Sequence, residues 1–318
     1  MSQPLSRRLQ PYVCLLSAVI LLSSITPVMK YLFQHTDILP IGMAAIRVAI
    51  GFALLLAISV VKERRGLMSL TPRDLVQLSL VGSLGVFSYG LAAWGLRSTS
   101  VIHYILIYGL LPSFTAIFSF LIGKEQVGAL KVTGIGIAFL GCAVSISEGV
   151  DRAWHTFGVG ETLVLLFTIA MSAHIVLNTG LVRRLGVMTS NTMMFGTSAC
   201  GLFLWAVTCE EAPHMDISLT ATTLMVYIGV ATAAVFFFRS LSLQSLTPLT
   251  VGTFHHLVPV CTVALAYLFL GEPIDLHTVI GAAIILAGTE CVRRGTRGEQ
   301  CLTPRYVTLG GQPQRTMP

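Results

Sequence analysis

The feature that most constrains this chain is a series of ten apolar stretches, each long enough to cross a lipid bilayer. A transmembrane helix needs about 20 predominantly apolar residues, whereas a transmembrane barrel strand has about 10 residues of alternating polarity. These stretches are long and do not alternate, so they predict an all-α integral membrane protein with ten transmembrane helices. The predicted spans are 11–33, 38–61, 75–96, 102–122, 130–147, 158–181, 189–209, 220–240, 249–270 and 274–292.

The composition excludes the soluble classes of protein. Charged residues make up only 11% of the 318 residues, against about 25% in soluble domains. Hydrophobic residues make up 54%, and the mean hydropathy is +0.80. A soluble enzyme, a nucleic-acid-binding protein and a disordered chain are therefore excluded. The seven cysteines form no Cys-x-x-Cys pair, and most lie inside predicted spans, so we expect buried free thiols and neither a metal site nor a cofactor.

Basic residues indicate the orientation in the membrane. If the N-terminus is cytoplasmic, sixteen of the twenty lysines and arginines lie on the cytoplasmic side, as the positive-inside rule requires. The sequence thus predicts an inner-membrane protein with both termini in the cytoplasm. We expect residues 1–10 to form a cytoplasmic N-terminus and residues 294–318, rich in Pro, Gly, Gln and Thr, to form a disordered cytoplasmic tail.

The two halves of the chain align with one constant offset of 147 residues. Pro112 then falls on Pro259, Glu125 on Glu272, and Tyr89 on Phe236. Gly134 and Gly141 fall on two further glycines of the second half, Gly281 and Gly288. Five helices is an odd number, so the second repeat enters the membrane from the opposite side. The sequence therefore predicts two inverted five-helix repeats, over residues 11–147 and 158–293.

These halves resemble the EamA family of the drug/metabolite transporter superfamily. The resemblance covers about residues 12–292, and its residues in the first half are Pro40, Arg47, Ala93 to Ser98, Pro112, Gly123, Glu125, Gly134 and Gly141. In the second half they are Ser242, Leu243, Pro259, Gly271, Glu272, Gly281 and Gly288. At the position that matches Arg47 the second half has Met194. The resemblance implies an inner-membrane exporter of small metabolites, such as amino acids or their derivatives.

Polar groups inside the spans are the candidate site residues. Arg47 lies about ten residues into the second span, where a cation costs about 2.5–3.5 kcal/mol. It either binds an anionic group of the substrate or ties helices together, whereas Lys30 is expected to extend its amine to the outer face.

Two prolines near the middle of the fourth and ninth spans predict helix breaks beside a central cavity. Pro112 and Pro259 each remove a backbone donor at matching positions of the two halves, although simple packing kinks are the alternative. Tyr108 and His255 each lie one turn before one of these prolines, and Asn178 lies one turn after His174 on the same face of the sixth span. The predicted substrate-binding set is Arg47, Tyr108, His174, Asn178 and His255. His256 points about 100° away from His255 around the helix, so we expect His255 to face the cavity.

The carboxylates lie at the ends of the spans, so no acidic residue offers an obvious proton or sodium relay at mid-membrane. We expect Glu125 and Glu272 to cap the next helix.

Small residues at four-residue spacing mark the fifth and tenth spans, as in Gly134, Ala138 and Cys142. Such stripes pack either within one chain or between the two chains of a homodimer.

Together these features predict a secondary transporter, and an exporter, of a small polar metabolite that works by alternating access. The cargo is expected to be an amino acid or an amino-acid-derived compound, with an opine-like metallophore as a second option. The alternatives are an importer or facilitator of another metabolite and, more distantly, a membrane enzyme. No nucleophile–base or metal signature favours an enzyme, and no soluble output domain favours a receptor.

Overall fold

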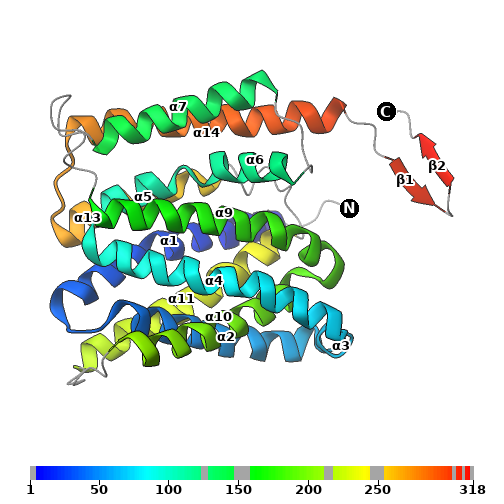
Figure 1. Ribbon diagram of the computed structural model, residues 1–318, viewed down its shortest axis with the longest axis horizontal. Helices are drawn as coiled ribbons and strands as arrows, with labels where there is room; N and C mark the ends of the chain where they lie inside the picture. The colour runs from blue at the N-terminus through cyan, green and yellow to red at the C-terminus, as the bar shows by residue number, and fades with distance from the viewer. Residues whose placement is uncertain are drawn as a thin grey trace.

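The computed structural model describes residues 5–122, 128–146, 158–210, 218–243, 254–302, 306–309 and 312–315. It is a bundle of long helices with a small hairpin beside it (Figure 1). The first four helices of the first half are α1 (Leu5–His35), α2 (Pro40–Lys62), the short α3 (Arg64–Met68) and α4 (Pro72–Ser98). Then come α5 (Val101–Tyr108), α6 (Leu111–Leu121) and α7 (Ala129–Ile146). The second half contains α9 (Val159–Leu185), α10 (Val187–Cys209), α11 (Leu219–Leu243), α13 (Leu257–Leu270) and α14 (Leu276–Leu302).

Within the described ranges, nine helical segments are long and apolar enough to cross a membrane. They correspond to nine of the ten predicted spans, and α5 and α6 together make the fourth of them. The remaining predicted span, 249–270, is described only from residue 254, and α13 within it is a shorter apolar helix of 14 residues. The predicted all-helical membrane fold is therefore confirmed.

Local sequence signals explain where the helices begin and end. Pro40 and Pro72 start α2 and α4, positions where the missing backbone N–H costs nothing. Thr71 and Asp74 form a capping box at the start of α4, and the hydroxyl of Ser100 accepts from the backbone nitrogen of His103 at the start of α5. Gly271 ends α13 in the left-handed conformation, with φ of 66°, which favours glycine.

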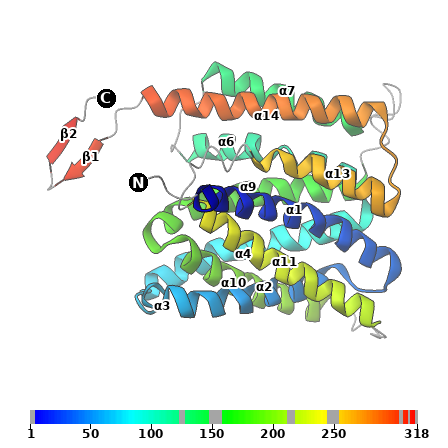
Figure 2. The same ribbon diagram turned by 180° about the vertical axis from the view of Figure 1, so that it is seen from behind.

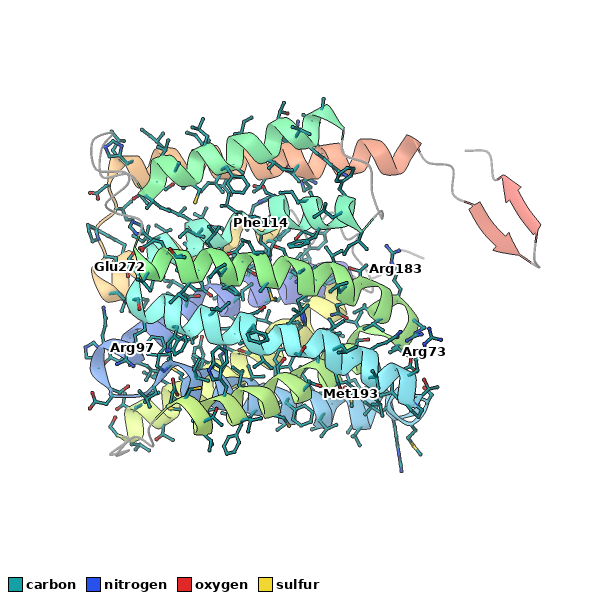
Figure 3. The ribbon with its side chains drawn as sticks, viewed as in Figure 1. Arg73, Arg97, Phe114, Arg183, Met193 and Glu272 are labelled. Atoms are coloured by element: carbon teal, nitrogen blue, oxygen red, sulfur yellow. The ribbon has the colours of Figure 1, made fainter. Side chains whose placement is uncertain are left out.

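Residues predicted to face opposite sides of the membrane lie at opposite ends of the bundle. Figure 3 shows Arg73 and Arg183 at one end, and Arg97 and Glu272 at the other. The first two belong to the predicted cytoplasmic set and the last two to the predicted outer side. Below, "inner end" and "outer end" mean these two ends.

The helices pack in antiparallel pairs drawn from the two halves. In the central layers α4 packs on α9 and α1 packs on α11, while α2 packs on α10 (Figures 1 and 2). In the outermost layer α7 and α14 lie against each other. The buried core joins residues of α1, α2, α4, α5 and α9, so the first half alone does not enclose it.

Close contact between α7 and α14 depends on glycine. A Cβ atom on Gly134 would lie 2.7 Å from the carbonyl oxygen of Gly288, and one on Gly141 would lie 2.9 Å from that of Gly281. Ala138 of the same stripe is fully buried. The small-residue stripes therefore pack within the chain, and a homodimer formed through these helices would use their other faces.

The structure describes part of the C-terminal region, for which the sequence predicts a disordered tail. Helix α14 continues to Leu302, about ten residues beyond the predicted span. Strands β1 (Tyr306–Leu309) and β2 (Gln312–Arg315) then pair antiparallel, with Tyr306 opposite Arg315. This hairpin lies outside the helical bundle (Figure 1).

Candidate functional site

Arg47 lies inside the bundle, and no carboxylate of the described residues pairs with it. It is half-buried on α2, seven residues or about 10 Å from the outer end of that helix. Its Nη1 contacts the sulfur of Met29 at 3.2 Å, and its guanidinium carbon lies 5.4 Å from the ring centre of Tyr89. Its Nε is buried and has no hydrogen-bond partner. A thioether is a weak acceptor, so these contacts leave the donors of Arg47 largely unsatisfied.

Six aromatic rings, beginning with Tyr89 against this arginine, form what we call the aromatic cluster. Tyr108 stacks on Phe167 of α9 with ring centres 5.5 Å apart and planes 3° from parallel, and Tyr104 stacks on the same ring at 5.7 Å. Tyr89 packs on Phe195 of α10 at 6.0 Å. Phe195 in turn meets Phe236 of α11 edge to face at 5.0 Å. The ring contacts of the cluster therefore join α5 to α9, and α4 to α10 and α11.

The three tyrosines of the cluster supply free hydroxyl groups. No described residue forms a hydrogen bond with the hydroxyl of Tyr89, Tyr104 or Tyr108. Tyr89 and Tyr104 both lie within electrostatic reach of Arg47. Arginine and tyrosine all donate hydrogen bonds, so this arrangement is complementary to an anionic group with an apolar or aromatic body.

Both prolines lie just after a break in their helix. The fourth span is interrupted at Gly109 and Leu110, and Pro112 is the second residue of α6. In the second half the turn falls at His256, and α13 begins directly after it with Pro259 in its first turn. With the offset of 147 residues, His256 corresponds to Gly109. Helices α5 and α13 also pack against each other, so the two breaks belong to neighbouring elements.

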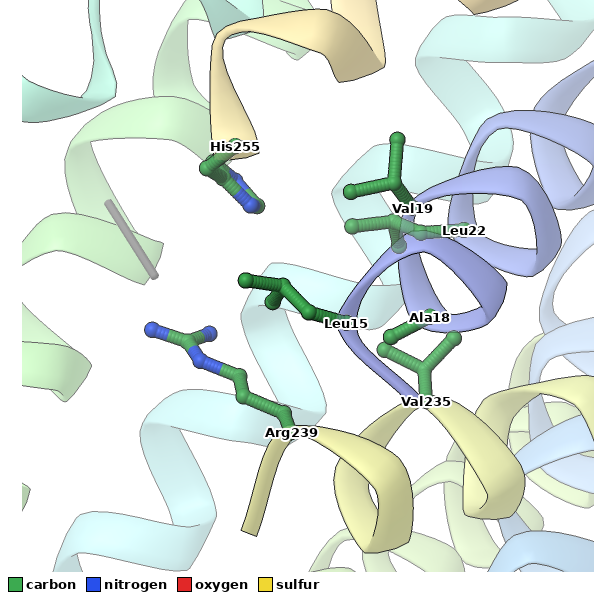
Figure 4. A pocket seen from close by; sticks show the side chains of 7 residues that line it. All are labelled: Leu15, Ala18, Val19, Leu22, Val235, Arg239 and His255. Carbon is green, nitrogen blue, oxygen red and sulfur yellow. The ribbon is translucent and has the colours of Figure 1, made fainter. Parts of the chain in front are cut away.

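A second cationic group, Arg239, lies beside His255 and was missed as a site residue by sequence reasoning. The two residues line a small, partly open cavity together with Leu15, Ala18, Val19, Leu22 and Val235. Figure 4 shows the side chains of Arg239 and His255 extending from α11 and from the segment before α13 into the same space, past Leu15 of α1. Arg239 is one of the sixteen basic residues that the positive-inside pattern places on the cytoplasmic side, and α11 continues one further turn beyond it, to Leu243.

His174 and Asn178 occupy a different part of the bundle. The Nδ1 atom of His174 is paired with the backbone oxygen of Val81 on α4, at 3.0 Å. Oδ1 of Asn178 is buried and has no partner among the described residues. No described contact joins either residue to Arg47, Tyr108 or His255. The contact of His174 with Val81 therefore ties α9 to α4.

Lys30 and the carboxylates at the outer end have structural partners. The amine of Lys30 donates to three backbone oxygens at the end of α4, those of Leu96, Arg97 and Thr99. Glu161 accepts from Thr99 and lies 3.2 Å from Nδ1 of His103. Lys30 thus ties α1 to α4 within the protein, where the sequence predicts that it extends to the outer face.

Glu272 caps a helix other than the one expected. Its two carboxylate oxygens accept from the backbone nitrogens of Val101 and Ile102, at 2.8 and 3.0 Å. It therefore caps α5 of the first half and not α14, the next helix along the chain. The matching Glu125 lies outside the described residues. Within the described ranges, no group of three or more His, Cys, Asp or Glu side chains could hold a metal ion.

A bundle with nine candidate spans in the part of the chain that the structure describes defines a multi-pass membrane protein. Two stretches, residues 10–147 and 158–293, match the EamA-like transporter family. The chain belongs to the EamA-like transporter family, as the resemblance in the sequence implied. It is therefore a membrane transporter.

The relatives and the fold agree with this assignment. A protein of Bacillus subtilis (strain 168) named "Uncharacterized transporter YyaM" is 25% identical over 293 residues, covering 89% of this chain and 93% of the relative. A "Probable terminal-alkyne amino-acid exporter" of Streptantibioticus cattleyicolor is 23% identical over 231 residues, covering 72% and 76%. One protein of known crystal structure superposes with a TM-score of 0.63 at 15% identity, covering 92% of this chain and 98% of that one, and shows the shared fold.

Proposed function

We propose that this protein is a secondary transporter, and an exporter, of a small metabolite that carries at least one anionic group. An amino acid or an amino-acid-derived compound fits this description, and an opine-like metallophore is the second option. The cargo binds between Arg47 and the aromatic cluster and crosses the inner membrane by alternating access. Export is supported by the relative named a probable terminal-alkyne amino-acid exporter.

The observation that carries this proposal is the unsatisfied guanidinium of Arg47. A cation in a transmembrane helix is costly and is retained where it has a partner or a function. No described carboxylate pairs with Arg47, and its Nε has no acceptor. A carboxylate of the cargo supplies that acceptor, and the planar guanidinium can bind it through two parallel hydrogen bonds.

The proposal includes ten spans arranged as two inverted repeats, with both termini in the cytoplasm. Contacts that come in matched pairs support it. Glu210 accepts from the backbone nitrogens of Ile41 and Gly42 at the start of α2, at 2.8 Å each. Glu63, which corresponds to Glu210 in the offset of 147 residues, accepts from the hydroxyl of Thr189 near the start of α10 at 3.3 Å. Thr189 corresponds to Gly42.

The glycine contacts between α7 and α14 also come in pairs related by the offset of 147 residues. Gly134 corresponds to Gly281 and Gly141 to Gly288. The contact of Gly134 with Gly288 therefore maps onto the contact of Gly281 with Gly141. A two-fold axis in the membrane plane produces this pattern, and inverted repeats of this kind underlie many transporters with alternating access.

The test of the function has two stages. Metabolite profiling of medium and cells, with and without the protein, identifies compounds that accumulate outside only when it is present. The same comparison with Arg47→Gln and Arg47→Lys, at equal membrane abundance, then tests the site. We expect loss of export with Gln and partial retention with Lys. Normal export by Arg47→Gln would show that this arginine has a structural role and remove the argument for an anionic cargo.

A further inference from the structure

Two arginines occupy different depths of the bundle, one from each half of the chain. Arg47 lies about 10 Å from the outer end of α2, whereas Arg239 lies one turn from the inner end of α11. Neither has an arginine at the corresponding position of the other half, where Met194 and Ala92 stand. Each cation is therefore a separate feature of this sequence and not a remnant of the repeat.

Arg239 has an exposed side chain close to the inner end of α11. It lines the partly open cavity together with apolar residues of α1. Among the described residues no carboxylate and no hydrogen-bond acceptor pairs with it. A guanidinium with no partner among the described residues can bind an anionic group beside this cavity, because its planar fork matches a carboxylate.

Tyr108 lies within electrostatic reach of Arg239. It also lies within electrostatic reach of Tyr89 and Tyr104, which are themselves within reach of Arg47. Tyr108 is the last residue of α5, directly before the break at Gly109 and Leu110. Its counterpart in the other half is His255, which lies beside Arg239 and directly before the second break.

We propose that Arg239 and His255 form a second binding site for the anionic group of the cargo, on the cytoplasmic side of Arg47. This inference rests on the proposed function. The cargo anion binds first at Arg239, passes Tyr108 and is then bound at Arg47. His255 donates a hydrogen bond to the anionic group of the cargo. It does not bind an ammonium group of the cargo, because the positive charge of Arg239 would repel that group.

The experiment measures the preference of the cavity for small anions. Val235 lies one turn before Arg239 and lines the cavity. In inside-out membrane vesicles, Val235→Cys is treated with two membrane-impermeant thiol reagents, the anionic sulfonatoethyl and the cationic trimethylammonioethyl methanethiosulfonates. Peptide mass spectrometry measures labelling at position 235, so the native cysteines remain. Ser69→Cys, at an exposed position between α3 and α4, is the control.

We expect the ratio of anionic to cationic labelling to be higher at position 235 than at position 69. Arg239→Gln should lower the ratio at position 235 by about fivefold or more, the factor expected from one nearby unit charge. Arg239→Met should do the same, and Arg239→Lys should preserve the ratio. The ratio at position 69 should stay constant in every variant, which shows that the reagents and vesicles behave alike.

Two results would overturn the inference: a ratio that both neutral variants leave unchanged, or an absence of labelling at position 235 from the cytoplasmic face. Arg47→Gln separates this inference from the proposed function, because it leaves Arg239 in place. If Arg47→Gln stops export while labelling does not respond to Arg239, the function stands and the second site falls. If Arg47→Gln exports normally while labelling depends on Arg239, the cytoplasmic site stands and the Arg47 site falls.

Discussion

The carboxylate of Glu272 accepts a hydrogen bond of 2.8 Å from the backbone nitrogen of Val101, 171 residues away in the sequence. This contact and its neighbour at Ile102 join the end of α13 to the start of α5. The break in the fourth span lies at the other end of α5, beside Tyr108 of the aromatic cluster. The outer end of α5 is therefore held by the second half of the chain.

Replacing Glu272 with alanine should destabilise this junction. Two backbone donors at the start of α5 lose their acceptor, and the loss of a helix-capping side chain costs about 0.5–2 kcal/mol. We expect a lower midpoint of thermal unfolding in detergent. Asp275→Ala is the matched control, because Asp275 is exposed and close by in the sequence. Equal midpoints for the two variants would contradict a capping role.

Arg47 and Lys30 should respond in opposite ways to replacement by methionine. Lys30 donates to three backbone oxygens, and Lys30→Met leaves those acceptors without it, which costs about 1–3 kcal/mol. Among the described residues, no carboxylate or backbone oxygen pairs with Arg47, which contacts a sulfur and an aromatic ring. Arg47→Met should therefore keep or raise the unfolding midpoint. A strong loss of stability with Arg47→Met would instead indicate a structural tie.

Glycine at position 134 should be irreplaceable, whereas glycine at position 136 should tolerate change. A Cβ on Gly134 would meet Gly288 at 2.7 Å, and one on Gly136 would meet nothing within 4 Å. Forced overpacking costs about 1–3 kcal/mol. We therefore expect Gly134→Ala to lower the unfolding midpoint or the membrane abundance, and Gly136→Ala to leave both unchanged. Equal tolerance at the two positions would show that α7 and α14 do not pack this closely.

His255 and His256 should differ in their effect on export. His255 lines the cavity with Arg239, whereas Nε2 of His256 lies 3.9 Å from the carboxylate of Glu290 on α14. We expect His255→Ala to impair export at equal membrane abundance and His256→Ala to affect it less. Loss confined to His256→Ala would reverse this assignment, and equal activity of both would remove the histidines from the cargo pathway.

The orientation of the chain can be tested with reporter fusions. A reporter that is active only in the periplasm should be silent at the C-terminus and active after Glu210, which lies on the predicted outer side. A strong periplasmic signal at the C-terminus would contradict the predicted topology. A reporter that is active only in the cytoplasm, fused at the same two points, should give the opposite pattern. This control shows that both fusion proteins are expressed.

The sequence alone determined the class of fold and the position of most spans. Long apolar runs have one stable solution in a bilayer, because every backbone group needs an internal hydrogen bond there. The sequence also singled out Arg47, since a cation inside such a run is visible in the order of residues. The prolines indicated where the fourth and ninth spans break, because proline lacks a donor wherever it stands.

The tertiary structure decided which groups meet. Glu272 caps α5 and not α14, because a carboxylate binds whichever free helix end packs nearest, and that end belongs to the other half. His174 contacts Val81 on α4, apart from His255, and spacing along one helix could not show this. Arg239 reads in the sequence as one more cation near the cytoplasm. Only the packing of α1, α11 and the segment before α13 places it in a cavity with His255, because a cavity is made by elements distant in the chain.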